Sequence, residues 1–310
     1  MNQRFFRSYP LLIALILPHT ACERAYSDTD VVSNPAARDA NTSNDKESQT
    51  AAQLQPGHQT IALRQTIQGK EQDRHAIVHT PKGFTPTRKY PAVFALHGNG
   101  GNAKEWPRRL APFIDKDGWI GIYPQGIQRS WNLGTEESKA DDVAFISQLV
   151  AMLDQYPGID MSRLFIIGIS NGAGMAHKLA IETSHFKGIA TIVTSLSETN
   201  RPHPKTTPVS VLQILGMKDK LIPYAGGPSR VGHNFLSAEE SAQVWASTNG
   251  CSLPPRKSTT RFGNEKIEYS GCKNQARVIH YGDPRAGHRI PKAFEGGLMK
   301  VCLDFFRELQ

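Results

Sequence analysis

The sequence predicts an α/β fold: a mostly parallel eight-stranded sheet with helices on both faces. Two observations predict it. Strand and helix patterns alternate along residues 57–310, and most of the predicted strands are continuous apolar runs, as expected of strands covered on both faces. Only the first two strands look antiparallel, because they alternate with period two around the polar turn Gly69-Lys70-Glu71. Residues 57–310 contain no repeat and no internal boundary, so we expect one large domain.

The strands follow from the spacing of apolar residues. Two segments alternate between apolar and polar residues, and six later segments are short apolar runs bounded by turn residues. In chain order the eight predicted strands cover residues 61–67, 75–80, 91–96, 119–123, 164–167, 189–193, 209–215 and 277–281.

The helices follow from apolar residues at helical spacing. The clearest covers residues 139–156, where five apolar residues recur and two aspartates lie near the start. Pro107 and Pro112 predict that the helix before it is short or broken, and Pro291 suits the first turn of the last one. These other helices are expected at residues 103–116, 173–182, 238–247 and 291–307.

Residues 1–22 are typical of an export signal. Arg4 and Arg7 precede an apolar run, residues 11–17, that is too short to span a bilayer. Two processing routes fit: ordinary signal-peptide cleavage, or cleavage at a lipobox-like site with lipidation of Cys22. The lipobox pattern departs from the usual one at His19, where a leucine-like residue is common.

Residues 23–56 are polar and poor in large apolar side chains, which predicts a disordered linker ahead of a domain at 57–310. The signal predicts an extracellular or periplasmic protein. If Cys22 is lipidated, it predicts an outer-membrane lipoprotein with a membrane anchor at that residue.

Charge and cysteine usage narrow the function further. The net charge of +8 is scattered and accompanies no nucleic-acid motif, so we expect no nucleic-acid partner. No cysteines stand at metal-finger spacing, and we expect neither metal nor cofactor. Cys302 lies in an apolar helical pattern that predicts a buried thiol. Cys251 and Cys272 bracket a short loop that a disulfide could close in an oxidising compartment, contributing about 3 kcal/mol.

The motif Gly168-Ile169-Ser170-Asn171-Gly172 lies between a predicted strand and a predicted helix. G-x-S-x-G at such a junction is the nucleophile elbow, a tight turn that projects its serine. The alternative is a plain glycine-rich turn before a helix. Its position between strand and helix favours Ser170 as a nucleophile.

A serine needs a base to take its proton and an acid to orient that base. Behind a nucleophile elbow these follow in the chain order serine, acid, histidine. Asp219 comes just after the strand at residues 209–215, although a turn-capping aspartate is the alternative. His288 follows the last predicted strand, and Asp283 on the same loop is a rival acid.

Two backbone N–H groups are expected to stabilise the developing oxyanion. One should come from Asn171, directly after the serine. The other should come from Asn99 in His97-Gly98-Asn99-Gly100-Gly101, a loop at the end of a strand whose glycines let the backbone approach a substrate. His97 is expected to fix this loop rather than to act in catalysis.

Several motifs together resemble a known group of enzymes. They are residues 96–101 (LHGNGG), 141–146 (DDVAFI), 168–172 (GISNG), 217–224 (MKDKLIPY), the stretch from Trp245 to Cys272, and Gly287-His288. In this order, over roughly residues 70–310, the chain resembles the polyhydroxybutyrate depolymerase and feruloyl/acetyl-xylan esterase group of the α/β-hydrolase superfamily. The resemblance implies a Ser170, Asp219 and His288 triad and a Cys251–Cys272 disulfide. The residues after His288 depart from the family's usual aromatic pattern.

These observations predict a serine esterase that hydrolyses carboxylic esters through an acyl-enzyme, as a monomer. Its substrates would be small or polysaccharide-linked esters, with short hydroxyalkanoate, feruloyl or acetyl groups. An inactive binding scaffold and a serine peptidase are the alternatives. We expect the pocket walls from loops 125–138 and 222–236, with Trp131 and Tyr224 as candidate wall residues; Trp131 fits the edge of a core equally well.

Overall fold

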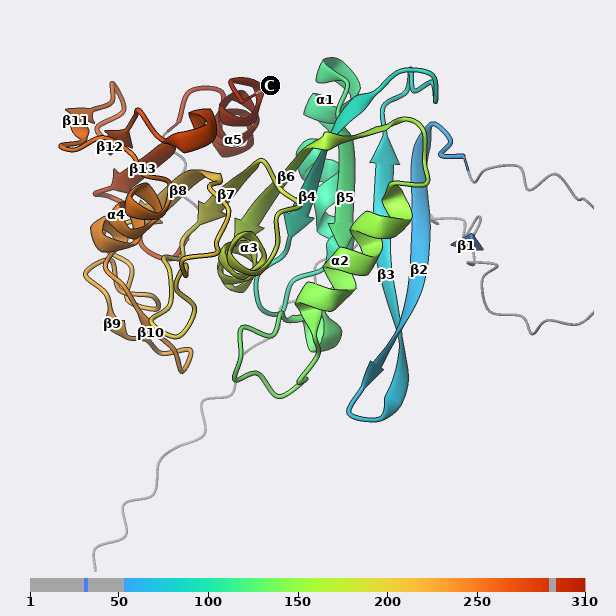
Figure 1. The fold of residues 1–310 in the computed structure, drawn as a ribbon, viewed down its shortest axis with the longest axis horizontal. Helices are drawn as coiled ribbons and strands as arrows, with labels where there is room; N and C mark the ends of the chain where they lie inside the picture. Colours follow the sequence, from blue (N-terminus) through green and yellow to red (C-terminus); the bar gives the residue numbers. More distant parts are fainter. Residues whose placement is uncertain (1–30, 33–52, 290–293, 310) are drawn as a thin grey trace, which may run out of the picture. The chain divides into compact units, whose positions relative to one another are not determined.

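The computed structural model describes residues 31–32, 53–289 and 294–309. Within these residues an eleven-stranded sheet has the order β1-β2-β3-β5-β4-β6-β7-β8-β13-β12-β11 (Figure 1). Its strands are β1 (Val31–Val32), β2 (Gly57–Ile67), β3 (Lys70–Thr80), β4 (Tyr90–Leu96), β5 (Ile120–Pro124), β6 (Ile159–Ile169), β7 (Gly188–Ile192), β8 (Ser210–Gly216), β11 (Arg256–Thr259), β12 (Glu265–Tyr269) and β13 (Val278–Asp283). A separate small sheet pairs β9 (Gly227–Pro228) with β10 (Asn234–Phe235).

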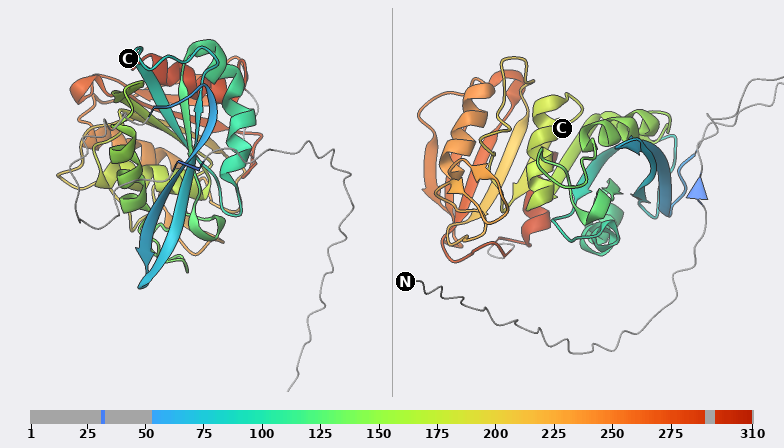
Figure 2. Two further views of the ribbon diagram at one scale, coloured as in Figure 1. Left: turned by 90° about the vertical axis from the view of Figure 1, so that its right-hand side faces the viewer. Right: turned by 90° about the horizontal axis from the view of Figure 1, so that it is seen from below.

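The predicted fold class is confirmed. Every predicted strand is present, as β2 to β8 and β13, and each neighbouring pair from β5 across to β13 is parallel. The first hairpin, β2–β3, is antiparallel as expected and extends as a long twisted ribbon (Figure 2). The sheet is wider than predicted because β1, β12 and β11 add to its edges.

Helices cover both faces of the sheet. The α-helices are α1 (Trp106–Asp117), α2 (Asp142–Leu153), α3 (Asn171–Glu182), α4 (Ala238–Thr248) and α5 (Leu298–Arg307), with short 3-10 turns η1 (Ala103–Glu105), η2 (Ile127–Arg129) and η3 (Lys273–Gln275). One apolar cluster packs α2, α3 and α4 on one face, and a second packs α1 and α5 on the other. Successive residues of β4 face these two clusters alternately, Phe94 to the first and Ala95 to the second.

Two predicted helix boundaries are wrong. The segment expected to be a short or broken helix consists of the 3-10 turn η1 followed by α1, which continues through Pro112. α2 begins at Asp142 because the side chain of Asp141 caps it, accepting the N–H of Ala144. α5 begins at Leu298, because Gly297 has a φ of 90°, which a right-handed helix excludes; the predicted start at Pro291 lies outside the described residues.

The start of the folded domain also differs from the prediction. The linker was predicted to be disordered up to residue 56. Val31 and Val32 nevertheless pair with β2, and Leu54 is buried in the core. The domain therefore draws on residues before 57. The predicted export signal, Cys22 and the rest of the linker lie outside the described residues.

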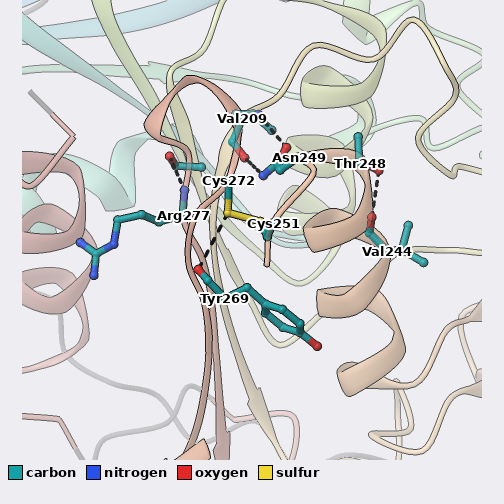
Figure 3. Close-up of a disulfide and its surroundings, with 9 residues drawn as sticks. Val209, Val244, Thr248, Asn249, Cys251, Tyr269, Cys272 and Arg277 are labelled. Atoms are coloured by element: carbon teal, nitrogen blue, oxygen red, sulfur yellow. Dashed lines mark hydrogen bonds between the residues drawn. A yellow bond between two sulfur atoms is a disulfide. The ribbon is translucent and has the colours of Figure 1, made fainter. Parts of the chain in front are cut away.

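A disulfide joins Cys251, just after α4, to Cys272, just after β12 (Figure 3). Beside it, the Asn249 side chain accepts the N–H of Val209 and donates to its carbonyl, fixing the end of α4 to the start of β8. Cys302 is a free, buried thiol, as predicted. None of the described helices is long and apolar enough to cross a membrane.

Candidate functional site

Ser170 occupies a strained turn between β6 and α3. Its φ of 53° and ψ of −121° are rarely adopted by residues other than glycine. A Cβ atom on Gly172 would lie 2.4 Å from the carbonyl oxygen of Leu96, so only glycine fits there. The Ser170 N–H donates to the Ile192 carbonyl at 2.9 Å, which holds the turn against β7.

The structure brings Ser170, His288 and Asp219 into one hydrogen-bonded chain. Ser170 Oγ lies 2.9 Å from Nε2 of His288, and Nδ1 of His288 lies 2.8 Å from Oδ2 of Asp219. The Asp219 carboxylate is fully buried, and its other oxygen accepts the N–H groups of Leu221 and Ile222. These two bonds fix the carboxylate toward the imidazole.

Asp283, the rival acid, points elsewhere. Its Oδ1 accepts the backbone N–H of Arg285 at 3.0 Å, and no hydrogen bond joins it to His288 in the described part of the chain. Its backbone is nevertheless important, because the Asp283 carbonyl accepts the N–H of Met217 at 2.9 Å. The Ala286 carbonyl accepts the N–H of Lys218 at the same distance. The loop that carries the acid and the loop that carries the histidine are thus joined main chain to main chain.

The two predicted oxyanion donors border the same cavity as Ser170. Asn99 and Asn171 both line it, and Asn171 is the first residue of α3, where backbone N–H groups have no partner within the helix. The Asn171 side chain is bonded twice to Trp131, accepting its N–H at 2.7 Å and donating to its carbonyl at 2.9 Å.

His97 fixes the Asn99 loop. Its Nδ1 lies 2.9 Å from the Gly98 carbonyl, while Nε2 accepts the N–H of Gly126 at 3.0 Å. Nδ1 therefore carries the hydrogen and Nε2 the lone pair. Burial lowers the pKa of His97, which favours this neutral ring.

The chain is similar in sequence and fold to known esterases. The chain is 27% identical over 220 residues to feruloyl esterase B of Piromyces equi, spanning 66% of this chain and 40% of that protein. It is 23% identical over 225 residues to feruloyl esterase C of Emericella nidulans, spanning 67% and 74%. Among solved structures, an acetyl xylan esterase from Aspergillus awamori superposes with a TM-score of 0.55 at 16% identity, over 76% of this chain and 94% of that one. No protein-family model matches the chain.

The chain has the α/β-hydrolase fold and is similar in sequence to feruloyl esterases. In this α/β hydrolase the cavity beside Ser170 measures about 440 Å³. Both predicted wall loops contribute to it. The first supplies Ser130, Leu133 and Glu136, and the second supplies Ile222, Val231, His233 and Phe235.

The two named wall residues were wrong. Trp131 is completely buried. Its indole N–H donates to the His97 carbonyl at 2.9 Å, so it stabilises the loop that carries Asn99. The Tyr224 hydroxyl turns away to Nε2 of His280 at 2.8 Å. The sequence of a loop has no regular periodicity, so it does not predict which side chains face a cavity.

Two polar residues of the cavity wall, Glu136 and His233, were missed by sequence reasoning. For His233, the signal in the sequence is its place within the predicted wall loop 222–236. Within the described residues, no group of three or more His, Cys, Asp or Glu side chains could hold a metal ion.

Proposed function

We propose that this protein is a serine-dependent carboxylic ester hydrolase that works through an acyl-enzyme. The observation that carries the proposal is the chain from Ser170 through His288 to Asp219, which opens on a cavity of about 440 Å³. The similarity to feruloyl esterases over about two thirds of the chain supports the same chemistry. The match covers only 40% of the first of these relatives, so the activity and the substrate of this chain are both proposals.

Each residue has a defined role in this mechanism. Ser170 Oγ attacks the ester carbonyl while Nε2 of His288 takes its proton, and Asp219 holds the ring and stabilises the imidazolium. The backbone N–H groups of Asn99 and Asn171 stabilise the oxyanion. His288 then gives its proton to the departing alcohol. A water molecule, activated by the same imidazole, hydrolyses the acyl-enzyme and restores Ser170.

The size and lining of the cavity suit a small acyl or alcohol group. Its lining combines apolar side chains such as Leu133, Val193 and Phe235 with polar side chains, as sites for small organic ligands do. We propose short hydroxyalkanoate, feruloyl or acetyl esters as substrates, either free or linked to polysaccharide. We further propose that the enzyme acts as an exported monomer.

A serine-directed fluorophosphonate probe tests the enzymatic proposal directly. Folded wild-type protein should be labelled at Ser170, and Ser170→Ala should not be labelled. The same two proteins should then be tested on para-nitrophenyl acetate and butyrate, methyl ferulate, a hydroxybutyrate oligomer and a peptide amide. Failure to label the wild type would leave a binding scaffold, whereas cleavage of only the amide would indicate a peptidase.

Export and anchoring need a separate experiment. The full-length protein and Cys22→Ser should be expressed in a Gram-negative host and divided into membrane and soluble fractions. If Cys22 is lipidated, the wild type remains with membranes and the variant is released. Equal release of both forms would identify a plain secreted enzyme.

A further inference from the structure

His233 and Glu136 form a polar pair in the wall of the cavity, outside the proposed catalytic chain. Nε2 of His233 lies 2.9 Å from Oε1 of Glu136, and both side chains line the cavity. The side chains are only 7% and 18% exposed. Among the described residues, no hydrogen bond joins either of them to Ser170, Asp219 or His288. This largely buried polar pair therefore has a role still to be assigned.

Glu136 determines which nitrogen of His233 carries the hydrogen. Its Oε2 accepts three backbone N–H groups, those of Leu133 at 2.7 Å, Gly134 at 3.1 Å and Thr135 at 3.2 Å. Three donors on one oxygen fix the position of the carboxylate. Its other oxygen accepts from His233, because a carboxylate oxygen accepts hydrogen bonds. Nε2 of His233 is therefore the donor.

In the neutral ring this leaves a lone pair on Nδ1 of His233. Nδ1 has no hydrogen-bond partner in the described part of the chain. Among the described residues, Nδ1 of His233 is not one of the fully buried polar atoms without a partner. It therefore keeps some exposed surface. Because the ring lines the cavity, a ligand bound in the cavity can supply the hydrogen-bond donor for Nδ1.

We propose that His233, oriented by Glu136, is a substrate-binding residue whose Nδ1 accepts a hydrogen bond from a hydroxyl group on the ester. This rests on the proposed function and deepens it, because it names the substrate class as hydroxylated esters. An analogue without the hydroxyl would fill the cavity and leave Nδ1 without a partner. Leaving a buried acceptor unpaired is what gives such sites their selectivity.

Matched ester pairs test the proposal, at pH 8 so that an ordinary imidazole is neutral. Methyl 4-hydroxycinnamate and methyl cinnamate differ by a hydroxyl on the acyl side; 2-hydroxyethyl cinnamate and ethyl cinnamate differ on the alcohol side. We expect wild type to prefer the hydroxylated member of one pair by about tenfold in kcat/KM, as one buried hydrogen bond allows. Which pair responds identifies the side of the ester that contacts His233.

The decisive variant is His233→Phe. Phenylalanine keeps an aromatic ring in the wall but has no nitrogen that could accept a hydrogen bond. The preference for the hydroxylated ester should therefore fall to about one. Thr135→Ala is the control, because its hydroxyl lies 3.5 Å from Nε2 of His233, too far for a strong hydrogen bond. It should retain the wild-type preference.

Glu136→Gln tests the orientation of the ring. The amide oxygen must face the three backbone N–H groups, which turns the amide NH₂ toward Nε2 of His233. Nε2 then accepts, and Nδ1 carries the hydrogen. The Kd ratio of methyl 4-methoxycinnamate, which can only accept, to methyl 4-hydroxycinnamate should therefore fall from its wild-type value.

Binding to Ser170→Ala, measured by calorimetry with the same pairs, gives the preference without turnover. It decides the inference even if the protein hydrolyses none of the esters, which would refute the proposed function alone. A merely structural role for His233 would lower binding of both members equally and leave their ratio unchanged. An unchanged ratio in His233→Phe, or no preference in wild type for either pair, overturns the proposal.

Discussion

At the scale of single residues, the most constrained position is Ser170. Its positive φ stores about 1–3 kcal/mol of backbone strain, which the surroundings must offset. They do so through the bond from its N–H to Ile192 and through the Thr194 hydroxyl, which donates to the Ser170 carbonyl at 2.9 Å. The strain lifts the hydroxyl out of the turn and toward His288.

Replacing the proposed nucleophile or base should nearly abolish activity. Ser170→Ala and His288→Ala should each lower kcat on the best ester about a thousandfold or more, because the two side chains act as a unit. Circular dichroism and the melting temperature should match wild type. Residual activity above a few per cent in either folded variant would contradict these roles.

The two aspartates can be separated by the same amide substitution. Asp219→Asn should lower kcat strongly, though less than loss of the serine, because an amide still contacts the ring but does not stabilise the imidazolium. Asp283→Asn should stay within a few-fold of wild type, since its side chain bonds Arg285 and not His288. The reverse ranking in steady-state assays would make Asp283 the acid.

At the scale of elements, the wall loop 125–138 is held by a buried ion pair. Arg74 on β3 bonds Asp142 at the start of α2 at 2.6 Å, and both side chains are completely buried. The second carboxylate oxygen of Asp142 accepts the N–H of Asn132 at 2.7 Å. Arg74 also lies over the ring of Phe145, 3.7 Å from its centroid. A salt bridge between a strand and a helix thus positions the cavity wall.

Asp142→Asn should destabilise the protein by about 3–5 kcal/mol, because it leaves the buried guanidinium without a counter-charge. The neighbouring Asp141→Asn is a matched control, since Asp141 is exposed and asparagine caps a helix as well as aspartate. Urea unfolding of the two variants measures the difference. Equal stability of both would show that Arg74 finds another partner.

The disulfide should stabilise the part of the sheet next to α4. The two cysteines are 21 residues apart, and closing a loop of that size contributes about 3 kcal/mol. Cys251→Ala combined with Cys272→Ala should therefore lower the melting temperature by roughly 10 °C. Reductant should have a similar effect on wild type and none on the double variant. A melting temperature that both treatments leave unchanged would rule out this contribution.

At the scale of the whole molecule, buried neutral histidines link stability to pH. Burial lowers the pKa of His177 and of His79 to about 4, and that of His280 to about 3. In the unfolded chain these rings titrate near about 6.5. Above that pH they do not affect stability. Below it the unfolded chain binds protons that the folded protein excludes, so stability falls with acidification.

Urea midpoints measured between pH 8 and pH 5 should therefore be level above about pH 7 and fall below about pH 6.5. Each fully buried ring contributes a loss of up to about 1.4 kcal/mol per pH unit. His79→Gln removes one of these groups, so the urea midpoint should decrease less steeply below about pH 6.5. A midpoint that does not change from pH 7 to pH 5 would contradict the lowered pKa values.

The central sheet could be predicted because its strands are buried on both faces and so appear as apolar runs. β11 could not, because all four of its residues are exposed and polar, and only pairing with β12 makes it a strand. The order of functional groups could likewise be predicted from strand ends. The direction of individual loop side chains could not: Trp131 and Glu136 share one loop, yet only Glu136 reaches the cavity.

The main-chain bonds from Met217 and Lys218 to Asp283 and Ala286 have a consequence for protein engineering. The spacing between Asp219 and His288 is set by peptide groups that every residue except proline supplies, so surface side chains on these loops can be varied freely. Exchanging one loop alone for a homologue's loop of different length would instead shift its peptide groups, break these bonds and separate acid from base. Chimeras should therefore carry residues 216–219 and 283–288 together as one transplanted module.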